Sequence, residues 1–434
     1  MIILKDMLSS QVRIRFLTIL ITFLALGDKI TAQEIETENR AANKIEDIKS
    51  TDKEQNNDFN LPKDYKITLG YFTDLRFIAS NGILFNKLGY DLYYKLISPH
   101  MPQTIGKFVE PVWNAFVTFH FTLWPHEAGH WCRANQADGN FIMTKYQFPI
   151  PVMKMIMPEG GPLPEQEAVM SSGGFEINNL MRRQTEYDFY LKGYRYTEDM
   201  AHSFIQSIFF PMYTLLFAFT DPKKPQTWEN TYGDPVQYTK IIFEHYYGRP
   251  SINAENKTDP ALVALYNEIF WVNLAATFLD PMLYQSAPAM TADINKRPLI
   301  RKPWLLGDNA FRWMFSLQFN PGALGYEVYF TNHFRISEKY FALNIRYGRP
   351  FKNYGFGIFM PEVFSGDTFS LGASVDVFNQ AIFGAGFGVS LIPAFHFGQN
   401  YKIALDISYK SKGYILGRKL EKGAEFLLHT ILEF

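Results

Sequence analysis

The sequence lacks the residues that several common kinds of site require. It has a single cysteine, Cys132, in 434 residues, which excludes an intramolecular disulfide framework and a cysteine-rich zinc or iron–sulfur site. Basic residues are not in surplus, because 42 Lys and Arg face 43 Asp and Glu. A protein that works mainly on nucleic acid usually carries a basic excess, so a nucleic-acid partner is not expected.

Long apolar helices without polar interruptions are also scarce. The segment 204–219 is apolar except for residues such as Gln206 and Pro211, and 262–279 is interrupted by Asn and Glu. Neither is a clean membrane span of about 18 or more residues. These segments suit the core of a globular domain, and they also suit a chain that must pass the inner membrane without being stopped there.

The N-terminus has the features of an export signal. Basic residues precede the apolar run 16–26, and small residues lie near Ala32, so we expect a signal peptide over 1–32. The run is short for a full span of about 20 residues, which leaves an uncleaved anchor as the alternative. Residues 33–62 are charged and rich in Asn and Gln, and we expect a disordered tether there.

Hydrophobic periodicity divides the remainder into two parts. Residues 63–305 are expected to form a mainly helical domain, with helices over 105–137, 165–186, 198–219 and 260–284. The segment 66–77 alternates loosely and could form one strand. The segment 221–259 is rich in Pro, Tyr and charge, and we expect a long loop there.

From Phe311 onwards the period becomes two, and about eight strands are expected within 306–434. One face of each strand is apolar and aromatic, whereas the other carries Gly, Ser and charge. A soluble β-domain would turn the apolar face inward, and an outer-membrane barrel would turn it towards lipid. The expected fold class is therefore α+β, with an antiparallel β-domain. An outer-membrane barrel is favoured, because the last strand, 426–434, ends in Phe and resembles the terminal signature of bacterial outer-membrane barrels.

The chemistry is expected at His126, Glu127 and His130, in the sequence His-Glu-Ala-Gly-His. Residues i and i+4 share one face of a helix, so the two imidazoles can reach one metal ion. Zinc bound by neutral imidazoles lowers the pKa of a bound water towards 7, and Glu127 is placed to accept its proton. Burial of these polar groups among aromatic residues would be costly without such a partner.

This motif resembles the zincin metallopeptidases. No third histidine follows at the metzincin spacing, so the third ligand must come from elsewhere. In the gluzincins a Glu on a second helix completes the site, which implies Glu176 within Ser-Gly-Gly-Phe-Glu-Ile-Asn-Asn. The small residues of that segment would let its helix pack tightly against the His-Glu-x-x-His helix. Asn179, about one turn on, could orient the carboxylate.

A second candidate for the third ligand is Asp280, which ends an apolar helical stretch that contains Asn273. This arrangement resembles, at a distance, the site-2 protease family, in which an Asn…Asp segment supplies the third ligand. The chain departs from that family because its proline-rich signature is absent and its helices are less apolar. The sequence leaves Glu176 and Asp280 as alternatives.

The resemblance implies a zinc-dependent metallopeptidase of the bacterial cell envelope. Its substrates would be peptides or proteins, and it would lie in the outer membrane or, alternatively, in the periplasm. A non-catalytic outer-membrane structural or transport protein with a retained metal site is the competing hypothesis. Hydrolysis of a lipid or of another amide would use the same metal and base.

Overall fold

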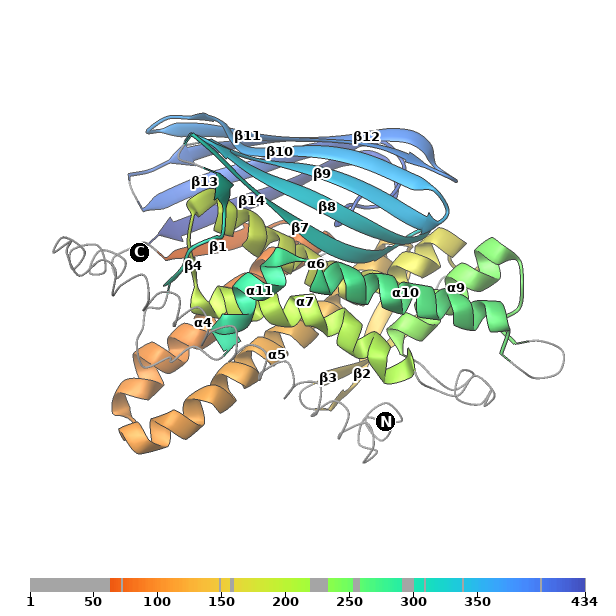
Figure 1. Ribbon diagram of the computed structural model, residues 1–434, viewed down its shortest axis with the longest axis horizontal. Helices are drawn as coiled ribbons and strands as arrows, with labels where there is room; N and C mark the ends of the chain where they lie inside the picture. Colours follow the sequence, from red (N-terminus) through yellow and green to blue (C-terminus); the bar gives the residue numbers. More distant parts are fainter. Residues whose placement is uncertain are drawn as a thin grey trace.

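The computed structural model has an α+β fold, in which helices lie beneath one antiparallel sheet (Figure 1). It describes residues 63–71, 73–147, 150–156, 160–218, 233–252, 258–290, 300–307, 310–337, 339–398 and 400–433. The expected signal peptide, 1–32, and the expected tether, 33–62, both lie outside these residues.

The helical layer follows much of the expected pattern. Its main helices are α4 (Leu75–Leu92), α5 (Gln103–Gln136), α6 (Pro164–Lys192), α7 (Thr197–Ala218), α9 (Asp234–Tyr247), α10 (Pro260–Phe278) and α11 (Pro281–Ser286). A small hairpin, β2 (Asn140–Gln147) and β3 (Ile150–Ile156), follows α5. Helices α5, α6 and α7 lie within a few residues of the ranges that their periodicity predicts.

Three expectations about local structure are only partly correct. The strand expected over 66–77 is β1 (Asp64–Leu69), and α4 follows it after Asp74, whose carboxylate caps the helix by accepting from the Arg76 amide. The helix expected over 260–284 is broken at Asp280, which caps α11. The loop expected over 221–259 contains α9, because Gly233 and Pro235 favour a helix start at Asp234.

The main sheet has ten strands in the order β1-β14-β13-β12-β11-β10-β9-β8-β7-β6. Its long strands are β7 (Phe311–Gly322), β8 (Gly325–Ile336), β9 (Lys339–Pro350), β10 (Asn353–Ser365), β11 (Phe369–Gln380), β12 (Gly384–His396), β13 (Tyr401–Lys410) and β14 (Gly423–Glu433). Consecutive strands are antiparallel neighbours. The N-terminal strand β1 pairs with β14, and β6 (Leu306–Gly307) lies at the other edge.

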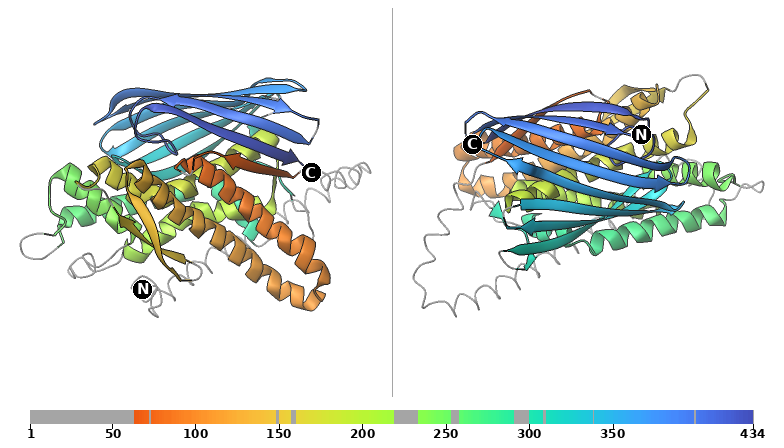
Figure 2. Two further views of the ribbon diagram at one scale, coloured as in Figure 1. Left: turned by 180° about the vertical axis from the view of Figure 1, so that it is seen from behind. Right: turned by 90° about the horizontal axis from the view of Figure 1, so that it is seen from above.

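The sheet curves over the helices as an arch, with its concave face towards them (Figures 1 and 2). Within the described residues β1 and β6 do not pair, so the strands form an open sheet and not the closed barrel that the sequence favours. Helix α6 runs under the arch, and its Arg183 and Asn179 bond Gln318 and Asn320 of β7. The concave face is therefore joined to the helices by polar contacts.

Candidate metal centre

The His-Glu-x-x-His motif lies in the C-terminal half of α5, a helix of 34 residues. His126 and His130 are both buried, and their rings meet edge to face with centroids 5.0 Å apart. Their Nε2 atoms are 3.4 Å apart. The helical spacing thus brings the two imidazoles together, as the sequence predicts.

Asp234 completes a group of three possible metal ligands. It is the first residue of α9, and its Oδ2 lies 3.0 Å from His126 Nε2 and 3.3 Å from His130 Nε2. Its side chain is 25% exposed, whereas those of the histidines are nearly buried. Ser171 of α6 donates a hydrogen bond to the Asp234 carbonyl at 3.4 Å, so α6 helps to hold the start of α9.

The separations of these three atoms suit a zinc ion. Ligand atoms in a tetrahedral zinc site lie about 2.0–2.1 Å from the metal and therefore about 3.3 Å from one another. The observed separations are 3.0, 3.3 and 3.4 Å. One ion could contact all three atoms with its fourth position left open.

The partners of the outer ring nitrogens bear on whether each Nε2 atom is left for a metal. His130 Nδ1 lies 2.7 Å from the Met170 carbonyl, which can only accept, so Nδ1 carries the proton. His126 Nδ1 lies 3.3 Å from the Asn178 amide, whose Oδ1 is buried without a hydrogen-bond partner in the described part of the chain. Exchange of the two Asn178 amide atoms would let Oδ1 accept from His126 Nδ1.

The charges of the three groups are strongly linked. Burial lowers the pKa of His130, but the adjacent Asp234 carboxylate outweighs this and raises it to about 9. Burial acts to raise the pKa of Asp234, but His130 and His126 hold it well below its usual range. A positive charge is therefore favoured between these groups, and a metal ion can supply it.

Glu127 lies beside the group without joining it. Burial raises its pKa, although the two histidines act in the opposite direction. It makes no hydrogen bond or ion pair with any residue that the structure describes. A carboxylate with a raised pKa beside a candidate metal position has the properties of a general base.

Close contact between α5 and α6 depends on glycine. A Cβ at Gly129 would lie 2.2 Å from the Gly173 carbonyl oxygen, and a Cβ at Gly174 would lie 2.5 Å from the His126 ring. The tight packing that the small residues of 172–174 predict is therefore present. His126 is further enclosed by Phe175 of α6 and Phe209 of α7, with ring centroids at 4.9 and 5.2 Å.

Glu176 is placed elsewhere than the sequence predicts. Its carboxylate forms a fully buried ion pair with Arg133 of α5 and accepts the Gly417 amide at 2.7 Å. These contacts join α5, α6 and the connection between β13 and β14. The structure does not bring Glu176 to the two histidines, because Arg133 and the Gly417 amide bind its carboxylate oxygens.

Asp280 is also held away from the histidines. It pairs with Arg182 of α6, caps α11 and accepts the Leu317 amide at 3.1 Å. Asn179, expected to orient Glu176, donates instead to the Phe319 carbonyl and to Asn320. Neither of the two carboxylates expected as third ligand belongs to the group that His126 and His130 form.

Sequence reasoning missed Asp234 because 221–259 was expected to be a loop. The signal was present in Gly233-Asp234-Pro235, since Gly before and Pro inside the first turn mark a helix start. Tyr213 of α7 was also missed. Burial is the main cause of the raised pKa of its phenol, and the nearby charges of Asp234 and Glu127 raise that pKa further.

Comparisons with known proteins add no family to this description. No protein-family model, no curated protein and no solved structure matches the chain.

Proposed function

We propose that this chain is a zinc-dependent metallopeptidase of the bacterial cell envelope. The observation that carries the proposal is the group of His126 Nε2, His130 Nε2 and Asp234 Oδ2, with separations of 3.0–3.4 Å. Three electron-rich atoms at these distances repel one another unless a proton or a cation lies between them. The protonated outer nitrogen of His130 and the unpartnered Asn178 amide oxygen both favour the cation.

Zinc held by the two histidines and Asp234 would polarise a substrate carbonyl and make water acidic at neutral pH. Glu127 would then accept a proton from the attacking water and transfer it to the leaving amine. Its raised pKa brings the carboxylate closer to the range in which both transfers are efficient. Tyr213, near Asp234 and Glu127, is a candidate hydrogen-bond donor to the developing oxyanion.

The cell-envelope location is proposed from the export signal expected over 1–32 and from the strand pattern of the sheet. The outer membrane is favoured over the periplasm. In this proposal the open sheet would hold the protein in the outer membrane, as a β-barrel does in other outer-membrane proteins. A non-catalytic outer-membrane protein with a retained metal site is the second candidate. The exposed apolar side chains of β9 to β14 support this second candidate, because a membrane role for them requires no catalytic activity.

Metal analysis and one conservative substitution separate these candidates. The purified protein is expected to contain about one zinc ion per chain, measured by plasma mass spectrometry. Glu127→Gln is expected to keep the zinc and to lose about 10²–10⁴-fold in turnover of a quenched-fluorescence peptide library. Full activity in this variant would refute the base assignment, and zinc without turnover in the wild type would favour the non-catalytic candidate.

The same measurement identifies the third ligand. Asp234→Ala is expected to lose zinc, whereas Asp280→Asn is expected to keep it, because Asp280 is bound to Arg182 and to backbone amides. Zinc retained at full occupancy in Asp234→Ala would overturn the assignment of Asp234. Circular dichroism of both variants controls for loss of fold.

A further inference from the structure

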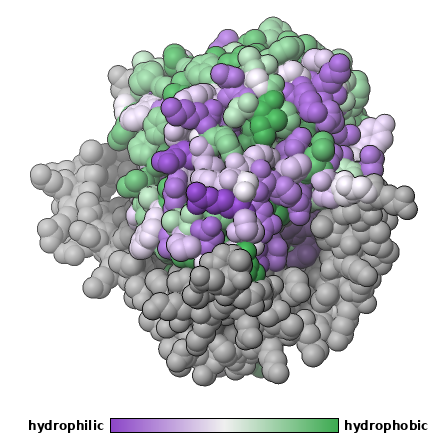
Figure 3. All heavy atoms as spheres, turned by 90° about the vertical axis from the view of Figure 1, so that its right-hand side faces the viewer, coloured by the Kyte–Doolittle hydropathy of each residue, from purple (hydrophilic) through white to green (hydrophobic). Residues whose placement is uncertain are grey.

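The convex face of the sheet is apolar and has no covering layer in the part of the chain that the structure describes. We define it as the side chains of β1 and β7–β14 that point away from the helices. Its exposed apolar members on β9–β14 include Ile345, Tyr347, Tyr354, Phe356, Met360, Phe364, Val375, Val377, Phe387, Val389, Leu391, Phe395, Ile407, Tyr409, Phe426 and Leu428. Figure 3 shows hydrophobic residues along the top of the molecule, over this face. Contiguous exposed apolar patches spread over several neighbouring strands are unusual on soluble monomers and mark interaction surfaces.

The two faces of the sheet are inverted relative to a soluble β-domain. Many of the positions that alternate with the convex set are polar and buried on the concave side, for example Ser390, Asp406 and Glu425, and they lie among buried apolar residues such as Phe378 and Leu427. Burial of polar groups beneath an exposed apolar face is unfavourable in water, because the hydrophobic effect drives the opposite arrangement. The arrangement is favourable where the outer solvent is itself apolar.

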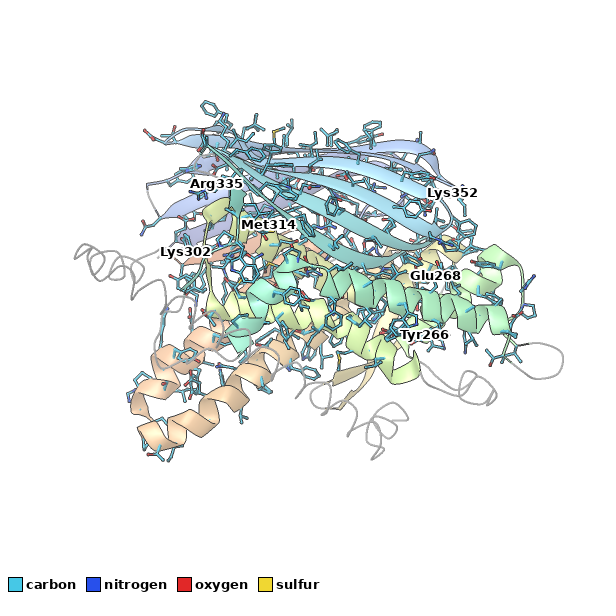
Figure 4. All side chains as sticks on the ribbon, in the orientation of Figure 1. Tyr266, Glu268, Lys302, Met314, Arg335 and Lys352 are labelled. Carbon is cyan, nitrogen blue, oxygen red and sulfur yellow. The ribbon has the colours of Figure 1, made fainter. Side chains whose placement is uncertain are left out.

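Charges on the convex face lie only near strand ends. Along the paired outward positions of β9, the charged residues are Lys339, which begins the strand, and Arg349, next to its last residue. Figure 4 shows Lys352, in the turn between β9 and β10, at one end of the long strands. The central part of the face is left to aliphatic side chains such as Val375 and Leu391.

Aromatic residues gather in two bands that border this aliphatic centre. At one end Tyr347 meets Tyr354, with ring centroids 5.6 Å apart, and Phe387 lies 6.1 Å from Tyr409. At the other end ring pairs join neighbouring strands at 5.0–6.2 Å, namely Phe334–Phe341, Phe364–Phe369, Phe369–Phe395 and Phe397–Tyr401. Aromatic bands at both borders of an apolar zone are typical of the two interfaces of a lipid bilayer.

The dimensions of the face also fit a bilayer. Strand β9 has 12 residues, which corresponds to about 40 Å, or about 28 Å across a membrane at a tilt of 45°. Helix α10 packs beside β7 and has 19 residues, or about 28 Å. It alone among the described helices is long and apolar enough to cross a membrane, and its Trp271 is 60% exposed. It would extend the apolar surface beyond β7.

The curvature argues against a second copy as the cover. The apolar face is the outside of an arch (Figures 1 and 2), and two convex surfaces touch only along a narrow line. A fluid hydrocarbon phase covers a convex surface completely. The residues of the aliphatic centre lie on several neighbouring strands, so a narrow contact would leave most of them in water.

We propose that the convex face contacts the hydrocarbon interior of a lipid bilayer, with the two aromatic bands at the headgroup levels. The inference goes beyond the proposed catalysis and does not depend on it. It assigns the sheet a membrane partner on one side and the helical layer on the other.

Spin labels at defined depths test this proposal. Cys132 is the only cysteine and is fully buried, so the wild-type chain serves as the background. Leu391→Cys and Ile407→Cys mark the aliphatic centre, and Lys352→Cys and Lys412→Cys mark turns. The labelled full-length protein is reconstituted in phosphatidylethanolamine–phosphatidylglycerol vesicles, and power-saturation EPR measures collisions with oxygen and with a nickel chelate.

Labels at Leu391 and Ile407 are expected to favour oxygen, and labels at the two turns are expected to favour the chelate. Equal chelate access at all four positions would overturn the proposal. Strong dipolar broadening between copies at Leu391 or Ile407 would also overturn it, because it would show a second chain on this face. Failure of the wild type to float with the vesicles in a density gradient counts against it as well.

A pair of substitutions matched in exposure provides an independent test. Leu391 is 53% exposed in the aliphatic centre, and Phe397 is 57% exposed in the turn after β12. If water covered both side chains, Leu391→Lys and Phe397→Lys would have similar small effects on the association of the protein with vesicles. A bilayer penalises a charge at its centre far more than at its interface, so Leu391→Lys is expected to lose vesicle insertion and Phe397→Lys to keep it. Equal insertion of the two would refute the proposal.

Discussion

At the scale of single residues, the chemistry of the candidate metal centre depends on which nitrogen of each histidine ring faces the metal position and which faces a hydrogen-bond partner. His126 and His130 could be found from helical spacing alone. The partners of their outer nitrogens, Asn178 and the Met170 carbonyl, could not be assigned, because they depend on how α6 packs against α5. The Met170 carbonyl selects the His130 tautomer whose Nε2 is free to bind a metal, and Asn178 would do the same for His126 once its two amide atoms are exchanged.

Asn178 therefore has a positioning role that can be measured. Asn178→Leu removes Oδ1, the only hydrogen-bond acceptor that the Asn178 side chain can offer to His126, and nearly conserves the volume of the side chain. Loss of such a partner typically weakens metal binding by about 10–100-fold, and competition with a chromogenic chelator measures the effect on zinc. Asn179→Leu is the control, because Asn179 bonds Phe319 and Asn320 of the sheet. Equal losses in the two variants would contradict the role of Asn178.

Glu186 of α6 is predicted to make stability depend on pH. Burial raises its pKa to about 7, although Arg182 acts in the opposite direction, and its Oε1 is buried without a hydrogen-bond partner among the described residues. The folded state then holds a proton that the unfolded state releases at about pH 4.3. Stability from this group is present below that pH and declines as pH rises through about 7.

Glu186→Gln mimics the protonated form and should remove this dependence. Thermal unfolding of wild type and variant is compared in detergent at pH 5 and pH 8. The variant is expected to gain stability relative to the wild type at pH 8 and to gain little at pH 5. A gain of the same size at both values would show that ionisation of Glu186 is not the cause.

At the scale of helices and strands, hydrophobic periodicity over many residues was sufficient to predict an element. The residues that mark where α9 starts and where α10 ends were overlooked. Helices α5, α6 and α7 were predictable because apolar residues recur at helical spacing over many turns. Helix α9 is short and follows a segment rich in Pro and Tyr, so its start at Asp234 was hidden. The break at Asp280 was hidden because the apolar residues on either side continue without a gap.

The contact between α5 and α6 should be sensitive to a single methyl group. Gly129→Ala would place a Cβ 2.2 Å from a backbone oxygen of Gly173, which cannot move alone. We expect a loss of about 1–3 kcal/mol in the free energy of unfolding, together with weaker zinc binding because His126 and His130 lie on this segment. Denaturant unfolding and chelator competition measure the two effects.

Gly106→Ala is the matched control, since it lies in the same helix and its Cβ would meet nothing within 4 Å. Replacement of an unconstrained helical glycine by alanine normally stabilises by up to about 1 kcal/mol. A loss of stability in Gly106→Ala as large as in Gly129→Ala would indicate that α5 resists substitution for reasons other than the contact with α6.

At the scale of the whole molecule, the division into helices followed by strands could be predicted, but the way the parts join could not. Strands β7 to β14 can be predicted because successive side chains of a strand point to opposite faces of the sheet, so apolar and polar residues alternate within each strand. The approach of Asp234 to His126 and the contact of Glu176 with Gly417 join residues far apart in sequence. A single sequence carries no local signal for such pairs.

Glu176 is predicted to stabilise the whole fold, because its contacts join α5, α6 and the β13–β14 connection. Glu176→Ala would leave Arg133 buried and unpaired, which typically costs about 3–5 kcal/mol. Glu167→Ala is the control, since its pair with His245 is more than a third exposed and contributes little. Similar unfolding midpoints for the two variants would contradict the structural role of Glu176.

The pairing of β1 with β14 has a consequence for the order in which the molecule can form. Asp64 lies opposite Glu433, so the two strands that meet here are separated in sequence by all the described helices and by strands β7 to β13. Contacts of such long sequence separation form slowly. The β1–β14 side of the arch should therefore be among the last parts of the described structure to assemble, after the helices between these two strands are already in place.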